Sequence, residues 1–237
     1  MSYNLLVRVV RAGPRWMDKQ RELPLFPLNT VLFPGMALPL HIFEERYKLM
    51  IDECIRDSHP FGIVLIKSGP ELGGNAVVHD VGTVAHITQV ERLDDGRMNI
   101  AALGYSRFRI HSTHRQKPYL TGVVEDFPLQ DTTNAYARKL SRRVSQMLKG
   151  YLNIFATLGK VDLEMETFPE DPVTLAFLAA IILRMPTKDK QQLLCAPDLL
   201  TLLQTERKML YREVYILKLL VENGPRWRDD PQPFSTN

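Results

Sequence analysis

Cysteine, charge excess and long apolar runs are all scarce in this sequence, and each shortage excludes a class of protein. Cys54 and Cys195 are the only cysteines among 237 residues, which excludes a disulfide-rich secreted scaffold and predicts two free thiols in a reducing compartment. The most apolar run, Val173 to Leu183, is shorter than the roughly 20 residues that a membrane-spanning helix needs. Residues 1–10 lack the long apolar segment and the cleavage site of a signal peptide. We therefore expect a cytoplasmic protein with no membrane partner.

Net charge is close to balanced. The formal value is +3, and four basic residues against Asp18 near the start supply all of it: Arg8, Arg11, Arg15 and Lys19. Because the remainder is neutral, it offers no electrostatic attraction to nucleic acid or to an anionic membrane. Nucleic acid is therefore not an expected partner. RNA binding stays open as an alternative, because basic residues cluster in one helical segment: Arg138, Lys139, Arg142 and Arg143.

Recognisable catalytic and cofactor-binding motifs are also missing. The sequence has no Gly-x-Ser-x-Gly elbow and no Gly-x-x-x-x-Gly-Lys-Ser/Thr loop. Its six histidines show no zinc-finger spacing with the two cysteines, and the glycine cluster Gly69 to Gly74 contains Pro70 and leads into no helix. We expect no cofactor, no metal and no enzymatic activity. A peptidase that works without ATP is the remaining enzymatic alternative.

With 45% hydrophobic residues, the chain can nevertheless bury a sizeable core. It is organised around the segment Leu23 to Tyr47, which carries four prolines and one glycine among large apolar side chains. The prolines exclude a long helix or a central strand there, and Pro34-Gly35 predicts a turn. After Pro39, apolar residues recur at spacings of three and four, which predicts a helix over 43–56. Strand, turn, strand and helix are therefore expected in quick succession.

Short strands are predicted to follow this segment. Asp95-Gly96 is expected to form a tight hairpin turn, and Gly104 is expected to end a strand. Five or more short strands with one helix predict an antiparallel β-barrel domain over residues 21–130. The predicted strands lie at 61–66, 81–93, 97–103, 107–110 and 119–125.

Beyond Phe127-Pro128 the apolar spacing changes to that of helices. Asp171-Pro172 predicts a helix start, and the nearly all-round apolar segment that follows predicts a central, buried helix. Residues 131–223 are thus expected to form a helical bundle, which makes the fold class α+β. Residues 1–20 and 224–237 are expected to be tails, and Met17 is a candidate for the natural translation start.

An apolar surface is predicted beside the irregular backbone of the proline-rich segment. Methionine and aromatic side chains there suit contacts with varied apolar ligands. Burial in the core is the competing expectation for Phe26 and Phe33, whereas Met36, beside the turn, is the better surface candidate. The candidates for a groove that receives an extended or unfolded polypeptide are Phe33, Pro34, Gly35, Met36 and Phe43, together with Phe26 and the loop Ser68 to Asn75.

Several stretches resemble, in order, the N-terminal substrate-binding domain of the ATP-dependent Lon protease. The likeness covers about residues 22–222, and Ile42 to Tyr47 looks most like family members in which this domain stands alone. The stretches that carry it are Leu23 to Leu28, Leu32 to Gly35, Leu38 to Leu40, Gly82 to Ala85, Gln89-Val90, Gly104 to Ile110, Asp171 to Val173 and Lys190 to Leu194.

The resemblance implies a PUA-like β-barrel followed by a helical bundle, and it implies recognition of unfolded or degron-bearing proteins. A role as an adaptor for a separate protease or chaperone is compatible with it. The ATPase module and the Ser-Lys protease domain of full-length Lon are not found in the sequence. Proteolytic activity is therefore not expected.

Overall fold

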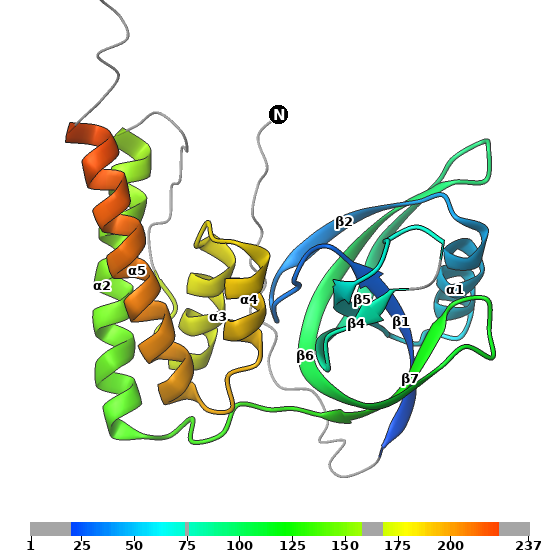
Figure 1. Ribbon diagram of the computed structural model, residues 1–237, viewed down its shortest axis with the longest axis horizontal. Coiled ribbons are helices and arrows are strands. Elements are labelled where there is room, and N and C mark those ends of the chain that lie inside the picture. Colours follow the sequence, from blue (N-terminus) through cyan, green and yellow to red (C-terminus); the bar gives the residue numbers. More distant parts are fainter. Residues whose placement is uncertain (1–19, 74–75, 158–167, 223–237) are drawn as a thin grey trace, which may run out of the picture.

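The computed structural model describes residues 20–73, 76–157 and 168–222, so the predicted tails and Met17 lie outside the described part, apart from Gln20. Strands come first and most helices second, as the sequence predicts (Figure 1). The strands are β1 (Arg21–Leu28), β2 (Ala37–Ile42), β3 (Phe61–Ser68), β4 (Val77–Val78), β5 (Val81–Arg92), β6 (Met98–His114) and β7 (Leu120–Asp126). The helices are α1 (Glu45–Arg56), α2 (Ala135–Thr157), α3 (Pro172–Ile182), α4 (Thr187–Leu194) and α5 (Leu199–Glu222).

Five strands close into a barrel. Their order is β1-β7-β6-β5-β3, and β1 pairs again with β3 to complete the circle. The β1–β3 pairing is parallel, whereas the other pairings between the named strands are antiparallel. Among the described strands β2 pairs with β6 alone, and Figure 1 shows it along the outside of the barrel, with its start near α4. The predicted α+β fold with a β-barrel is confirmed.

The prediction that Gly104 ends a strand is wrong, because β6 continues through it to His114. Gly104 is required for close packing instead. A Cβ atom at this position would lie 2.3 Å from the carbonyl oxygen of Phe33. The turn of the proline-rich segment can therefore rest directly on the β6 backbone.

That turn has the predicted form. Met36 N–H donates to the carbonyl oxygen of Phe33 at 3.0 Å, and Gly35 has a φ of 82°, which a glycine adopts without strain. Gly35 N–H donates to Gly104 O, and Gly104 N–H donates to Met36 O, both at 2.9 Å. Two main-chain hydrogen bonds with Gly104 thus hold the turn against β6.

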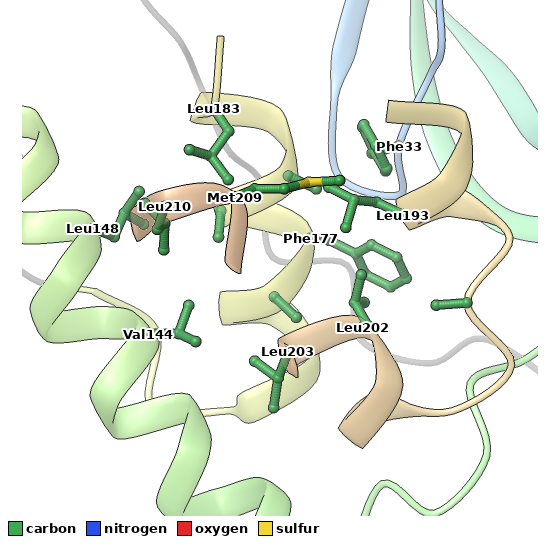
Figure 2. Close-up of a cluster of buried hydrophobic side chains, with 14 of the residues drawn as sticks. Phe33, Val144, Leu148, Phe177, Leu183, Leu193, Leu202, Leu203, Met209 and Leu210 are labelled. Atoms are coloured by element: carbon green, nitrogen blue, oxygen red, sulfur yellow. The ribbon is translucent and has the colours of Figure 1, made fainter. Parts of the chain in front are cut away.

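Helices α2, α3 and α5 pack against one another. α3 and α4 lie between the α2–α5 pair and the barrel (Figure 1). The Asp171 carboxylate caps α3 by accepting from Thr174 N–H at 2.8 Å, which confirms the predicted helix start. Leu175 to Ala180 are all buried, so α3 is the central helix expected from its composition. Phe33 of the barrel inserts beside Leu193 in the same cluster (Figure 2).

Candidate functional site

The structure separates the predicted contact residues along β2. Phe33 is 0% exposed and belongs to the core between barrel and bundle, so its assignment to a contact surface is corrected: its side chain is unavailable to a ligand in this conformation. Phe26 is also buried. Pro34, Gly35 and Met36 are partly exposed at one end of β2. Phe43, at the other end, is 49% exposed.

The exposed side of β2 links these two ends. Along β2, exposed and inward-facing residues alternate, because successive side chains of a strand point to opposite faces. Leu38, Leu40 and Ile42 pack inward, whereas Ala37, Pro39 and His41 are exposed. Their direct neighbours on β6 are Leu103, Ala101 and Asn99. We call these six residues and Phe43 the outer β2 face: Ala37, Pro39, His41, Phe43, Asn99, Ala101 and Leu103.

The middle of the outer β2 face is apolar and its ends carry polar or aromatic groups. At one end, His41 Nδ1 lies 2.8 Å from Asn99 Oδ1, and the Asn99 amide donates to Glu91 Oε2 at 2.9 Å. Beyond the other end, next to Leu103, the rings of His86 on β5 and Tyr105 on β6 meet edge to face at 5.3 Å. Burial lowers the pKa of His86, which favours the neutral imidazole at pH 7.

β2 is also an edge strand, since β6 is its one partner in the part of the chain that the structure describes. Pro39 has no N–H to offer a further strand, and proline on an exposed edge is a common protection against uncontrolled strand pairing. The outer β2 face therefore suits side-chain contacts better than strand addition. β2 is the second strand that the sequence predicts, after the Pro34-Gly35 turn, and the alternation Ala37-Leu38-Pro39-Leu40-His41 is the sequence signal for its exposed side.

The two cysteine side chains are protonated thiols at neutral pH. Both cysteines are free, as predicted, and burial raises the pKa of Cys54 to about 11 and also raises that of Cys195. At neutral pH both are thiols rather than nucleophilic thiolates. Residues 20–73, 76–157 and 168–222 contain no group of three or more His, Cys, Asp or Glu side chains arranged to hold a metal ion.

A second region, on the barrel wall, has two adjoining cavities that sequence reasoning missed. One, of about 300 Å³, lies between β4 and the end of β6. The other, of about 60 Å³, is bordered by Glu71 of the predicted loop, so part of that loop does line a cavity. Gly74 and Asn75 of the same loop lie outside the described residues.

No helix in the described ranges is long and apolar enough to cross a membrane.

Comparisons with known proteins agree with this architecture. Two solved structures share the fold: a Lon N-terminal domain protein from Xanthomonas campestris (TM-score 0.59, 24% identity) and the N-terminal domain of a Mycobacterium avium complex Lon protease (TM-score 0.64, 19% identity). The first likeness covers 79% of this chain and 98% of that structure, and the second covers 81% and 98%.

Similar sequences include Lon protease 2 of Myxococcus xanthus and a Lon protease of Anaeromyxobacter dehalogenans. Each is 28% identical over 207 residues, or 85% of this chain. The match covers only 25% and 24% of those proteins, so the chain spans about a quarter of their length. The model of the ATP-dependent protease La (LON) substrate-binding domain matches residues 22–212. The chain belongs to the family of this Lon substrate-binding domain.

Proposed function

We propose that this protein binds unfolded or degron-bearing polypeptides through the outer β2 face and catalyses no reaction on them. The family match over residues 22–212 is the observation that carries the proposal, because the family is defined as a substrate-binding domain. A bound client would then pass to a separate protease or chaperone, which makes the protein an adaptor.

The outer β2 face has the composition that such a role needs. An apolar centre with a polar rim is the usual arrangement of a protein-binding surface. Ala37, Pro39 and Ala101 form the centre and have short side chains, which places few steric demands on the client. Phe43 adds one large exposed ring. Met36, just before the opposite end, is partly exposed while it packs against the core. Binding should therefore tolerate many client sequences.

The test is binding of a denatured protein. Reduced, carboxymethylated α-lactalbumin with a fluorescent label would be titrated with the wild-type protein and followed by anisotropy. The variant Pro39→Asp/Phe43→Asp places two charges on the outer β2 face and should weaken binding at least about tenfold, which is about 1.4 kcal/mol. The matched control is Tyr136→Asp, because Tyr136 is 56% exposed and lies in the first turn of α2, where an acidic residue is tolerated.

Two results would refute the proposal. One is equal affinity for native and denatured α-lactalbumin. The other is an affinity of the Pro39→Asp/Phe43→Asp variant that equals that of the Tyr136→Asp control. Incubation of the client with the protein should leave the client uncleaved, and cleavage that one point substitution abolishes would favour the peptidase alternative instead.

A further inference from the structure

The barrel wall opens where β4 should continue the pairing of β5. Both strands run antiparallel to β3, β5 through Phe61 to Ile63 and β4 through Ile66 and Ser68. On its other side β5 pairs with β6, and Val81 opposite Arg109 is the last pair. Continuing that register would place Val78 opposite Ser112 and Val77 opposite Thr113. In the described part of the chain, however, β4 pairs only with β3.

The edges of β4 and β6 diverge beyond one last main-chain hydrogen bond. Ile110 N–H donates to the carbonyl oxygen of Asp80 at 2.7 Å, and beyond it β7 is the one described strand with which β6 pairs. The cavity of about 300 Å³ is the space between these edges, with β4 on one side and the end of β6 on the other. We call this opening the seam. Its lining includes Val77, Val78, Asp80, Ile110, Ser112 and Thr113.

Both ends of the seam are restricted. The Ile110–Asp80 hydrogen bond closes one end. At the other end, the Arg115 guanidinium crosses the opening and donates from Nη2 to the carbonyl oxygen of Ala76 at 3.2 Å. Arg115 and Ala76 also line the cavity of about 60 Å³, which thus continues the seam. A chain end fits such a space better than a chain that must enter and leave.

The small cavity is basic. Arg46 and Lys117 line it together with Arg115, against Glu71 as the one acidic residue of its lining. Arg46 is paired with Glu44 at 2.9 Å and Lys117 with Glu53 at 2.7 Å. Among the described residues, Arg115 forms no salt bridge and donates only to the Ala76 carbonyl. An anionic group is therefore complementary to this end of the seam.

We propose that the seam binds the C-terminal segment of an unfolded polypeptide as an added strand, with its terminal carboxylate held by Arg115. The proposal rests on the proposed function for its ligand class, but it assigns a second site. Strand addition uses main-chain hydrogen bonds and so requires little of the client's sequence. The carboxylate would replace the Ala76 carbonyl as the acceptor for Arg115, and hydrogen bonds between charged groups are stronger than those to neutral acceptors.

The bound chain has a defined direction. Its terminal carboxylate lies at Arg115 and its preceding residues lie toward Asp80, so it runs parallel to β6 and antiparallel to β4. Since β4 is two residues long, only the last two or three residues of the client can pair with it. Recognition should therefore depend on the chain end and very little on residues further upstream.

The experiment compares labelled peptides that differ only at the end. An N-terminally labelled decapeptide ending in Val-Thr-Val would be made with a free carboxylate, with a terminal amide, and with an N-methyl group on the threonine nitrogen. Anisotropy with the full chain should show about tenfold weaker binding of the amide and of the methylated peptide than of the free acid. Arg115→Gln should weaken binding of the free acid to the level of the amide and leave the amide unchanged.

Arg142→Gln is the matched control, because it removes one exposed positive charge from α2, far along the chain from the seam. Hydrogen exchange should show new protection at Val78 and Ser112 when the free-acid peptide is bound. Equal binding of acid and amide, or protection at residues 37–43 instead, would overturn the proposal. Displacement of the peptide by an oligonucleotide but not by a second free-acid peptide would also overturn it, in favour of a phosphate ligand.

Failure here is separable from failure of the proposed function. If the amide binds as well as the acid while denatured α-lactalbumin still binds through the outer β2 face, the seam proposal falls and the proposed function stands. If the Arg115→Gln variant loses the free-acid peptide but the Pro39→Asp/Phe43→Asp variant keeps it, the seam acts independently of the outer β2 face.

Discussion

Arg107 on β6 lies with its Nη1 atom 2.6 Å from the carbonyl oxygen of Leu194, the last residue of α4. The same nitrogen donates to Ala196 O at 2.7 Å, and the guanidinium carbon lies 4.6 Å from the centre of the Phe127 ring. The last carbonyls of a helix have no partners within the helix, and a cation at this end is favourable. Burial lowers the pKa of Arg107 to about 10, which still leaves it charged at pH 7. One side chain thus joins barrel to bundle.

Replacing Arg107 should destabilise the protein strongly. Arg107→Met leaves two buried carbonyl oxygens without donors, and we expect a loss of about 2–4 kcal/mol in the free energy of unfolding. Arg109→Met is the matched control, since Arg109 also stacks on Phe127, at 4.1 Å, but is exposed. Urea unfolding measures both variants, and equal losses would show that the contact with Phe127, rather than the α4 carbonyls, matters.

Glu206 should make the protein less stable as pH rises. It is 0% exposed, neither carboxylate oxygen has a hydrogen-bond partner among the described residues, and burial raises its pKa well above the usual value. The folded state therefore holds a proton that the unfolded state loses above a pKa of about 4.3. The protonated Glu206 side chain contributes fully to stability below the unfolded-state pKa. This contribution declines as pH rises toward the folded-state pKa, by up to about 1.4 kcal/mol per pH unit.

Two substitutions separate charge from packing at Glu206. Glu206→Leu should raise the free energy of unfolding at pH 7 and flatten its decline with pH. Glu206→Gln should flatten the decline too, but with less gain, because a buried amide still lacks partners. Glu170→Leu, at an exposed position, serves as the control. Chemical unfolding between pH 4 and pH 8 is the measurement, and parallel curves for wild type and both Glu206 variants would contradict the prediction.

Local chemistry made several elements predictable. Pro34-Gly35 predicted the turn that rests on β6, Asp171-Pro172 predicted the start of α3, and Asp95-Gly96 predicted the hairpin between β5 and β6. In each case, the residues that determine the conformation are adjacent in sequence. Glu206 shares the helical spacing of Leu202, Leu203 and Leu210, so its place on the buried side of α5 follows from the sequence once those leucines are assigned to the core.

Long-range packing was not predictable. Core burial of Phe33 was the competing expectation, but the α3 and α4 side chains that bury its ring lie far along the chain and could not be named from the local sequence. The seam depends on two strand edges, Val77 to Val78 and Ile110 to Thr113, that lie far apart in the chain and fail to pair. No local pattern encodes a missing pair of strands. Of the outer β2 face, only Phe43 was among the residues predicted from the sequence, because the β6 residues join it through strand pairing rather than through a local pattern.

Gly104 and Gly150 should respond in opposite ways to alanine. At Gly104 the new methyl group would meet the Phe33 carbonyl oxygen at 2.3 Å, so Gly104→Ala should cost about 1–3 kcal/mol of unfolding free energy. Gly150 lies within α2 and a Cβ there meets nothing within 4 Å. Gly150→Ala should therefore stabilise the protein by about 0.5–1 kcal/mol. Thermal unfolding compares them, and a neutral Gly104→Ala would show that the turn does not rest firmly on β6.

Reversing the charge of the exposed basic residues on α2 should leave polypeptide binding unchanged. Arg142 and Arg143 are exposed, on the helix that the bundle buries through Val144 and Leu148. Neither belongs to the outer β2 face nor to the seam, so Arg142→Glu/Arg143→Glu should bind denatured α-lactalbumin with wild-type affinity. If RNA is the ligand instead, wild-type binding to structured RNA should weaken steeply with added salt, and the double variant should reduce that salt dependence. A variant that loses α-lactalbumin would move the polypeptide site from the barrel to the bundle.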